Sequence, residues 1–385
     1  MENPKIRFKW FTKDWEQRKL NEVAEKICVG FVGTCEKFYT DESGIPMYRT
    51  GNLNGLSLNR DDLKYVTNEF HQHNQKSQLK AGDILIARHG DSGKAVNYEN
   101  SEEANCLNIV IIRPDFKKCN YKFLTNCINS PECQKHIKSL SAGSTQAVIN
   151  TSEIEKLGVV IPANIDEQNR IARYFSTLDH LITLHQRKCE QTKKLKKYML
   201  QKMFPQNGAK VPEIRFDGFT YDWEQRKLSD VVNIGSGMDY KHLGEGNIPV
   251  YGTGGYMCSV DKALSNDKDA IGIGRKGTID KPYLLRAPFW TVDTLFYCIP
   301  KEDYDLDFTS CLFQNVDWKK KDESTGVPSL SKLIISNVGT DTPTFDEQIK
   351  IGEYFSNLDH LITLHQRKCD ELKKMKKYML QNMFI

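Results

Sequence analysis

Several patterns that would indicate catalysis or metal binding are absent from this sequence of 385 residues. No two prolines are adjacent, which excludes the N/D-P-P-aromatic loop expected of an adenine methyltransferase. Gly93-Lys94 is followed by Ala95 and has no glycine five residues upstream, so it is not the phosphate loop G-x-x-x-x-G-K-[ST]. His71 and His73 have no further ligands at a spacing that suits a metal ion. We therefore predict no catalytic residue and no metal site in this chain.

Disulfides, membrane spans and a strong net charge are also lacking. The 11 cysteines are odd in number and form no C-x-x-C pair, which indicates reduced thiols rather than a disulfide framework or a zinc site. The longest apolar runs, such as Ile109 to Ile112, are too short to cross a bilayer, and the first ten residues contain no apolar leader. The 54 basic and 50 acidic residues give a net charge of +4, which permits nucleic-acid binding where the charge is uneven. We expect a soluble, cytoplasmic protein.

What the chain does contain is a long segment that occurs twice. Asp166–Phe204 and Asp346–Phe384 are identical at 29 of 39 aligned positions. A short opening is also copied, since IRFKWFTKDWEQRKL at Ile6–Leu20 returns as IRFDGFTYDWEQRKL at Ile214–Leu228. The chain is therefore a tandem duplication, in which a diverged lobe lies between each opening and each long segment.

Each copied long segment is predicted to form one helix. Its last 30 residues contain no Gly or Pro and are rich in Leu, Lys, Gln, Met and Glu. Apolar residues recur about every 3.5 residues, the period of a seam that packs against another helix. The predicted seam has His185 and Thr192 as polar insertions in the first copy. Its apolar residues are Ile171, Phe175, Leu178, Ile182, Cys189, Leu195, Met199 and Met203 in the first copy, and Ile351, Phe355, Leu358, Ile362, Cys369, Leu372, Met379 and Met383 in the second. Because the seams match, we expect an antiparallel coiled coil; the alternative is that each helix folds onto its own lobe.

The lobes are predicted to mix strands and helices. Strands are predicted at Ile84–Ala87, Leu107–Ile112 and Gly158–Ile161, and a helix over Tyr121–Leu140 with a break at Ser130-Pro131. Asp166 is expected to cap the first long helix and Asp346 to start the second. The predicted α+β architecture has a first lobe with its lead-in over residues 1–163, the first long helix and a linker over 164–207, a second lobe over 208–343, and the second long helix over 344–385.

The two lobes share three short matches that occur in the same order. Ile45–Gly51 aligns with Ile248–Gly254, Ile86–Gly90 with Ile273–Gly277, and Ser144-Thr145 with Ser324-Thr325. The difference in residue number between matched positions falls from 208 at the lead-in to 203, 187 and then 180 in the successive matches. We predict that this offset of 180 holds from the Ser-Thr pair through the long helix. We therefore predict one fold with two surfaces. Such lobes suit two different targets, for example the halves of a nucleic-acid site held about one DNA turn (~34–36 Å) or more apart.

On these residues the chain resembles, over its whole length, the specificity subunit of type I restriction-modification enzymes. The resemblance rests on W-E-Q-R-K-L at Trp15 and Trp223, on the D-E-Q helix openings at Asp166 and Asp346, and on the lobe motifs Gly82–Arg88, Gly143–Gln146, Ile149–Thr151, Gly272–Thr278 and Phe289–Phe296. It implies two pseudo-symmetric target recognition domains, separated by an antiparallel two-helix coiled coil, each of which reads one half of an interrupted DNA site.

The resemblance also implies partners for this chain. The helices would set the spacing between half-sites and dock two methyltransferase (modification) subunits, and restriction subunits would complete an ATP-dependent nuclease. S-adenosylmethionine, ATP and magnesium would then belong to those partners. This chain would be a non-catalytic recognition subunit.

Candidate DNA contacts follow from comparing the lobes, because shared residues suit phosphates and differing residues suit bases. Arg88 and Arg275 follow a predicted strand at equivalent positions, and Lys94 and Lys281 lie at equal distances beyond them. A salt bridge that holds each loop is the alternative role for these four residues. Three aligned pairs differ in chemistry and are candidate base readers, with a solvated surface as the alternative: Arg49 with Gly252, His89 with Lys276, and Gln146 with Gly326. Tyr251, from the shared I-P-x-Y-x-T-G match, completes the predicted DNA-binding set.

Lysines cluster in both long helices, where Lys193, Lys194, Lys196 and Lys197 recur as Lys373, Lys374, Lys376 and Lys377. Partner binding is predicted for Lys193, Lys194, Lys197, Lys373, Lys374 and Lys377, and the alternatives are a solvated helix face and contact with the DNA backbone. For the whole chain, the alternative function is a bivalent protein-binding scaffold that reads no DNA. The missing motifs disfavour a standalone nuclease or methylase.

Overall fold

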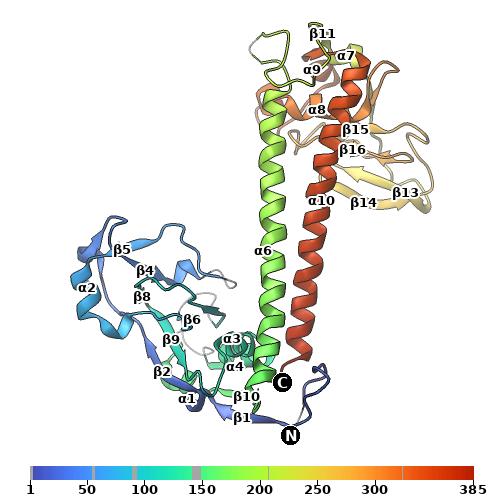
Figure 1. Ribbon diagram of the computed structural model, residues 1–385. Coiled ribbons are helices and arrows are strands. Elements are labelled where there is room, and N and C mark those ends of the chain that lie inside the picture. Colours follow the sequence, from blue (N-terminus) through green and yellow to red (C-terminus); the bar gives the residue numbers. More distant parts are fainter. Residues whose placement is uncertain (1–2, 54–56, 89–92, 141–148, 207, 323) are drawn as a thin grey trace. The chain divides into compact units, whose positions relative to one another are not determined.

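The computed structural model describes the chain except for residues 1–2, 54–56, 89–92, 141–148, 207 and 323, and it is drawn in Figure 1. The chain divides into two compact units. The first unit comprises Met1–His185 with Arg367–Ile385, and the second comprises Gln186–Gln366. Each unit therefore contains one lobe, the first half of the helix that follows that lobe, and the second half of the other long helix.

The two long helices are α6 (Ile165–Lys202) and α10 (Phe345–Asn382), with 38 residues each. They confirm the predicted helices, but their first residues differ from the prediction. Asn164 caps α6, because its Oδ1 accepts a hydrogen bond from Asp166 N at 2.8 Å and its carbonyl accepts from Glu167 N at 3.1 Å. Asp166 is therefore inside the helix, and α10 begins one residue before Asp346.

In each unit, the two helices pack against each other in antiparallel directions. In the first unit, Phe175 near the start of α6 contacts Phe384 just past the end of α10, with ring centroids 5.7 Å apart. In the second unit, Phe204 just past the end of α6 contacts Phe355 near the start of α10, at 6.1 Å. The helix starts also pack on their own lobes, since Phe123 lies in the same hydrophobic cluster as Phe175. The predicted antiparallel pairing is confirmed. The alternative, in which each helix folds onto its own lobe, also describes contacts that are present, so the two sets of contacts occur together.

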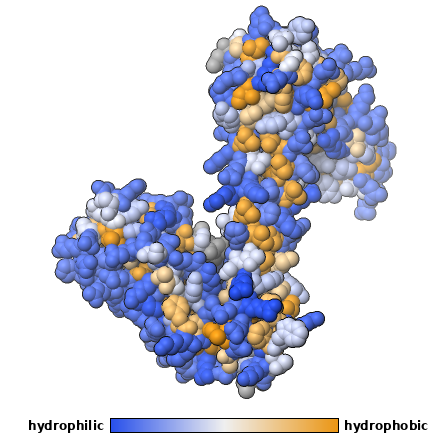
Figure 2. Space-filling model, viewed as in Figure 1, coloured by the Kyte–Doolittle hydropathy of each residue, from blue (hydrophilic) through white to orange (hydrophobic). Residues whose placement is uncertain are grey.

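One residue of the predicted seam is wrong. Leu195 is exposed, as is its copy Met375, whereas Leu372, the copy of Thr192, is buried. The seam therefore passes through the position of Thr192, and Leu195 lies to one side of it. Figure 2 shows apolar side chains on the exposed faces of the helix pair. The large ones are Leu195, Tyr198, Phe345, Leu361, Leu364, Met375 and Tyr378.

The first lobe consists of two four-stranded sheets and a short two-stranded ladder. The orders are β2-β9-β6-β7, β3-β5-β4-β8 and β1-β10. The strands are β1 (Trp15–Lys19), β2 (Ala24–Val29), β3 (Tyr39–Thr40), β4 (Ile45–Arg49), β5 (Lys64–Val66), β6 (Ile84–Ala87), β7 (Ala95–Asn97), β8 (Asn105–Leu107), β9 (Ile109–Pro114) and β10 (Gly158–Pro162). The helices are α1 (Leu20–Val23), α2 (Asn68–His73), α3 (Tyr121–Ile128), α4 (Pro131–Leu140) and α5 (Thr151–Glu155), with 3-10 turns at Glu36–Phe38, Thr50–Asn52 and Gln75–Ser77.

Most predicted elements of this lobe are confirmed, and one is divided. The strands at Ile84 and Gly158 are present, and α3 and α4 meet at the predicted break. The strand predicted over Leu107–Ile112 is interrupted at Asn108, which has a φ of 54°. This left-handed residue turns the chain, so that β8 pairs with β4 and β9 joins the other sheet.

The second lobe has sheets of order β12-β18-β15-β16 and β14-β13-β17, with the ladder β11-β19. Its strands are β11 (Glu224–Lys227), β12 (Val232–Ser236), β13 (Glu245–Gly252), β14 (Gly255–Val260), β15 (Ala270–Gly274), β16 (Tyr283–Leu285), β17 (Trp290–Thr291), β18 (Leu295–Pro300) and β19 (Gly339–Thr342). Its helices are α7 (Leu228–Val231), α8 (Leu306–Asn315) and α9 (Lys332–Ser336), with a 3-10 turn at Trp318–Lys321.

The two lobes share one fold, as the matches predicted. The sheet β2-β9-β6-β7 corresponds strand for strand to β12-β18-β15-β16, and the parallel pair β4-β8 corresponds to β13-β17. The predicted offset of 180 is wrong before the long helices. Lys19 pairs with Gly158 and its copy Lys227 pairs with Gly339, so the offset there is 181. One extra residue between β10 and α6 restores 180 in the helices.

The cysteines are free thiols, as predicted, and ten of the 11 are buried. Within the described part of the chain, no helix has the length and apolar character that a membrane span requires.

Candidate nucleic-acid interface

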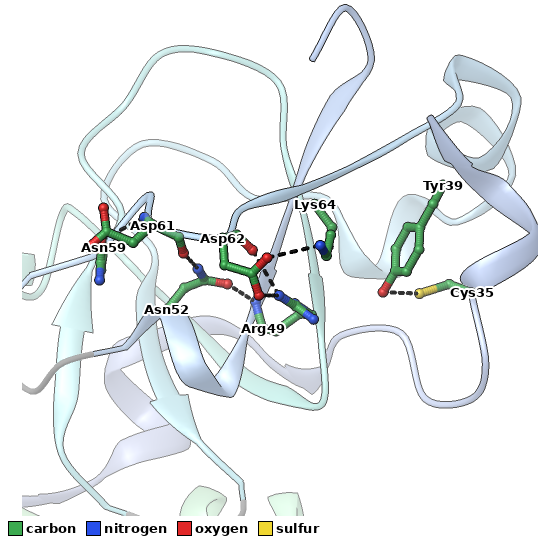
Figure 3. A network of polar contacts seen from close by, with 8 residues as sticks. All are labelled: Cys35, Tyr39, Arg49, Asn52, Asn59, Asp61, Asp62 and Lys64. Carbon is green, nitrogen blue, oxygen red and sulfur yellow. Dashed lines mark hydrogen bonds and ion pairs between the residues drawn. The ribbon is translucent and has the colours of Figure 1, made fainter. Parts of the chain in front are cut away.

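Arg49 ends β4 and belongs to a polar network on the first lobe (Figure 3). Its Nη2 donates to Asp62 Oδ2 at 2.9 Å and to the Asp62 carbonyl at 2.8 Å. Asp62 Oδ1 also accepts from Lys64 Nζ at 2.9 Å, and Asn52 Oδ1 accepts from Arg49 N at 2.8 Å. The hydrogen bond from Lys64, followed by that from Arg49, lowers the pKa of Asp62. Arg49 is therefore held by a carboxylate that stays charged at neutral pH, and base reading would require it to exchange this partner.

Tyr39 lies in the same view and is not linked to Arg49 by a hydrogen bond. The Cys35 thiol donates to Tyr39 Oη at 3.3 Å. Burial, and then the bond with Cys35, raises the pKa of Tyr39 to about 12. The phenol is therefore neutral and adds no charge to this surface.

Arg88 and Arg275 occupy equivalent positions directly after β6 and β15. The Arg88 carbonyl accepts from Ile149 N at 3.3 Å, and the Arg275 carbonyl accepts from Leu330 N at 2.9 Å. The Arg275 guanidinium lies 5.9 Å from the Phe296 ring centroid, and its Nη1 donates to the Asp293 carbonyl at 3.4 Å. Arg88 Nε is buried and has no hydrogen-bond partner among the described residues. Within that part of the chain neither guanidinium forms an ion pair.

The remaining predicted contacts lie in loops. Lys94, Lys276 and Lys281 are exposed, and Lys276 forms an isolated bridge with Ser329. Gly277, beside Lys276, has a φ of 95° that favours glycine. His89 and Gln146 lie outside the described residues, so their predicted roles stay predictions. The same holds for the DNA-binding roles of all the other candidates.

Tyr251 and Arg275 lie at one edge of the second lobe, where both bond to the same short segment of backbone. Val292 N donates to the Tyr251 carbonyl at 3.0 Å, and Arg275 N donates to the Thr294 carbonyl at 2.8 Å. The chain at 292–294 thus joins the ends of β13 and β15. Tyr251 is half-buried and packs edge-on against Tyr256, with centroids 6.4 Å apart. Its counterpart Tyr48 in the first lobe is fully buried.

A cleft in the first unit contains polar residues that the sequence did not single out. Its volume is about 600 Å³, and its lining includes Arg60, Asn97, Asn100, Lys122 and Lys376. Arg60 pairs with Glu102, and Lys122 Nζ lies 2.7 Å from Glu99 Oε1. Arg60, Asn97, Asn100 and Lys122 fall between the shared matches, where the lobes differ in length, so alignment of the two copies does not single them out, whereas Lys376 belongs to the copied helix.

The helix lysines separate into two groups. Lys196 and Lys376, which were not predicted to bind partners, are half-buried in ion pairs across the helix pair. The six predicted partner-binding lysines are exposed. Lys193 has a local ion pair with Glu190 at 2.9 Å, which is a role within one helix. The structure thus leaves Lys194, Lys197, Lys373, Lys374 and Lys377 on the surface as the candidates for docking.

Comparisons with known proteins agree with this architecture. The profile of the family described as "Type I restriction modification DNA specificity domain" matches twice, at residues 12–194 and 221–374. The MjaX specificity subunit of a type I restriction enzyme from Methanocaldococcus jannaschii is 23% identical over 96% of this chain and 92% of its own length. The EcoBI specificity subunit of Escherichia coli is 23% identical over 42% of this chain and 34% of its own length.

Solved structures show the same fold. The S subunit of a type I restriction-modification system from M. genitalium superposes with a TM-score of 0.74 at 18% identity, covering 100% of this chain and 99% of that one. A chain from a structural study of type I R-M complex assembly gives a TM-score of 0.51 at 14% identity, covering 96% and 97%.

Proposed function

This chain belongs to the family of type I restriction-modification DNA specificity domains, and we propose that each of its two lobes reads one half of a bipartite, interrupted DNA site. The observation that carries the proposal is that two lobes of one fold present different loops and different side chains at equivalent positions. Arg49 at the end of β4 and Gly252 at the end of β13 are an example. Two lobes that share a fold but differ in their exposed side chains suit two DNA half-sites of different sequence.

The repeated helices suit a different task from the lobes. Because α6 and α10 are nearly identical and each contributes to both units, they offer two equivalent surfaces. We propose that each surface docks one methyltransferase subunit, and that the helix pair fixes the number of base pairs between the half-sites. The exposed lysines and apolar side chains of both helices support this assignment. Restriction subunits would join the same assembly.

The chain's role in that assembly is recognition rather than catalysis. S-adenosylmethionine would bind to the methyltransferase subunits, and ATP with magnesium to the restriction subunits. The residues of this chain would position the target adenine relative to those partners. A scaffold that binds only proteins is the rival function, and the two make opposite predictions for DNA methylation.

The experiment is methylome sequencing of cells with and without this gene, complemented by the full-length chain. We expect a bipartite adenine mark that disappears with the gene and returns with complementation. Exchanging residues 208–343 for the second lobe of another family member should change one half of the mark only. An unchanged methylome, in cells whose methyltransferase subunit is expressed, would contradict DNA reading and favour the scaffold.

A further inference from the structure

The second lobe lacks a helix that covers the corresponding surface of the first. In the first lobe, Phe31 packs against Phe70 of α2, with ring centroids 5.0 Å apart. Met238 occupies the position of Phe31, because Phe31 N donates to the Cys106 carbonyl and Met238 N to the Thr291 carbonyl, each at 2.9 Å. The offset between lobes falls from 203 to 187 across this region, and the described second lobe contains no counterpart of α2. Met238 is consequently 52% exposed.

The tip of the β13–β14 hairpin extends this apolar surface. Tyr256 and Met257 are 63% and 50% exposed. Val250 pairs with Cys258 while Tyr251 pairs with Tyr256, so Met257 is the extra residue of a bulge. A bulge re-aims a side chain that a regular strand would direct elsewhere.

Because Gly252 has no side chain, the side chain of Met257 can lie against its backbone. A Cβ atom at Gly252 would lie 2.7 Å from Met257 Sδ and 3.5 Å from Val292 Cγ2. A Cβ atom on Gly237, beside Met238, would clash with the Val292 carbonyl, so Val292 is close to both methionines. At the position where the first lobe carries the guanidinium of Arg49, the second lobe therefore presents a thioether.

Basic side chains border this surface. Arg275 and Lys276 are exposed and are joined to the hairpin through the bonds of residues 292–294. Tyr283 Oη donates to the Gly252 carbonyl at 2.6 Å, which brings β16, and the exposed Lys281 before it, close to the hairpin tip. The exposed carboxylate of Asp293 lies at the same edge and would repel phosphates. The apolar residues and Asp293 therefore suit a position over the base edges in a DNA groove, and the basic residues around them suit contact with the phosphate backbone.

Resting on the proposed function, we infer that Met257, with Tyr256 and Met238, is the base-reading surface of the second lobe and recognises the C5-methyl group of thymine. The major groove admits a two-stranded β-ribbon, and the thymine methyl group is the apolar feature that it displays. An uncharged, polarisable surface gains little from guanine O6 or N7, which favour arginine. The two lobes would thus differ in the chemistry of their readers, with a guanidinium in the first and thioethers in the second.

The test uses the full-length chain assembled with its methyltransferase subunits, on the bipartite site found by methylome sequencing. Each thymine is replaced in turn by deoxyuridine, which removes only the methyl group, and Kd is measured by fluorescence anisotropy. We expect at least one replacement, in one half-site only, to weaken binding roughly fourfold, the effect of one buried methyl group. The Met257→Ala variant should bind the thymine and deoxyuridine sites equally, and Met257→Leu should retain the preference. Leu333→Ala, at an exposed side chain of α9 in the same lobe, is the control.

Three outcomes would overturn the inference. Equal affinity for thymine and deoxyuridine at every position, with bipartite binding intact, removes this reading and leaves the proposed function standing. Unchanged thymine preference in Met257→Ala and Met238→Ala, with weaker recruitment of partner subunits, would instead assign the surface to protein docking. An assembly that binds no specific DNA site would overturn the proposed function, and this inference with it.

Discussion

Lys196 Nζ of α6 lies 2.6 Å from Asp359 Oδ1 of α10, and the same contact recurs between their copies Lys376 and Asp179, also at 2.6 Å. Each compact unit therefore contains an ion pair that joins the two long helices. Residues 180 positions apart make the same contact in opposite directions, as an antiparallel pair of repeated helices requires. The pairs fix the register of the seam in both units.

The two ion pairs are not equivalent in their surroundings. Lys196 Nζ also donates to Gln314 Oε1 at 2.8 Å. Asn129 holds the place of Gln314 in the first lobe, but it bonds the backbone N and carbonyl of Ala95, each at 2.8 Å. The residue at the position of Ala95 in the second lobe is Pro282, which has no N–H to offer. This one difference leaves Gln314 available to Lys196.

Replacing either lysine by methionine should therefore destabilise its unit, and Lys196→Met should cost more. We expect Lys376→Met to lower the free energy of unfolding by about 1 kcal/mol, because its partner Asp179 is partly exposed. Lys196→Met should lower it by roughly 1 kcal/mol more, since it also removes the bond to Gln314. Urea unfolding followed by circular dichroism measures both, with the exposed Lys377→Met as control. Equal losses for the two variants would contradict the role of Gln314.

The copied tryptophans offer a second matched comparison. Trp15 and Trp223 are both buried, but Trp15 Nε1 donates to Glu167 Oε1 at 3.2 Å, whereas Trp223 Nε1 has no partner among the described residues. Trp→Phe removes similar bulk at both sites. We expect Trp15→Phe to cost about 1–2 kcal/mol more than Trp223→Phe, because only the first loses a hydrogen bond to a carboxylate. Urea midpoints with unchanged slopes would measure the difference, and a larger loss for Trp223→Phe would refute it.

Much of this fold could be predicted, because repetition within one chain shows which residues share a task. The repeated helices, their antiparallel pairing and the common lobe fold all followed from matched segments. Leu195 was misplaced because apolar spacing alone does not show that the half-buried Lys196 takes a seam position with its charge paired. Strand Leu107–Ile112 was drawn too long because a left-handed Asn108 leaves no hydropathy signal.

The candidate site was harder to predict for a physical reason. Arg49 was visible as a difference between the lobes, but its partner Asp62 lies in sequence that has no match in the second lobe. The exposure of Met238 depends on the missing counterpart of α2, and a deletion shows where residues are lost without showing what they had covered. Ion pairs between distant residues and the burial of a side chain by another element depend on how the lobe packs. An alignment of the two copies gives no information on that packing.

The Arg49–Asp62 pair should restrain base reading, and Asp62→Asn should release it. The pKa of Asp62 is lowered from the ordinary 3.8, so the pairing is complete above that value and is lost as the pH falls through the lowered pKa. Between pH 6 and 8 the effect of this pair on the wild-type affinity should accordingly be constant. We expect Asp62→Asn to strengthen binding to the cognate half-site by roughly fivefold, at the low end of a guanidinium–guanine contact. Lys64→Met, which removes the other partner of Asp62, is the control, and equal effects of the two variants would show that Arg49 is not the restrained group.

Base and phosphate contacts should differ in how their loss depends on sequence and salt. Arg49→Ala should weaken binding by about 1–3 kcal/mol and relax specificity at one position of one half-site. Lys281→Gln should weaken binding evenly across site variants and reduce the slope of log K against log salt by about one. Anisotropy titrations on a set of single-base variants at several salt concentrations distinguish the two patterns. Uniform weakening by Arg49→Ala would argue against base reading by that residue.

The exposed helix lysines should serve protein docking rather than DNA binding. Lys197 and its copy Lys377 are exposed at equivalent positions, beside lysines whose charges are already paired across the helices. If two identical partners dock on the two copies, Lys197→Glu or Lys377→Glu alone should lower methyltransferase stoichiometry from two subunits towards one, and the double variant should abolish capture. Native mass spectrometry of the co-expressed complex measures this, with Lys193→Glu, whose lysine is engaged by Glu190, as the comparison. Full stoichiometry for the double variant, together with a reduced salt slope for DNA binding, would move these lysines from the partner surface to the phosphate backbone.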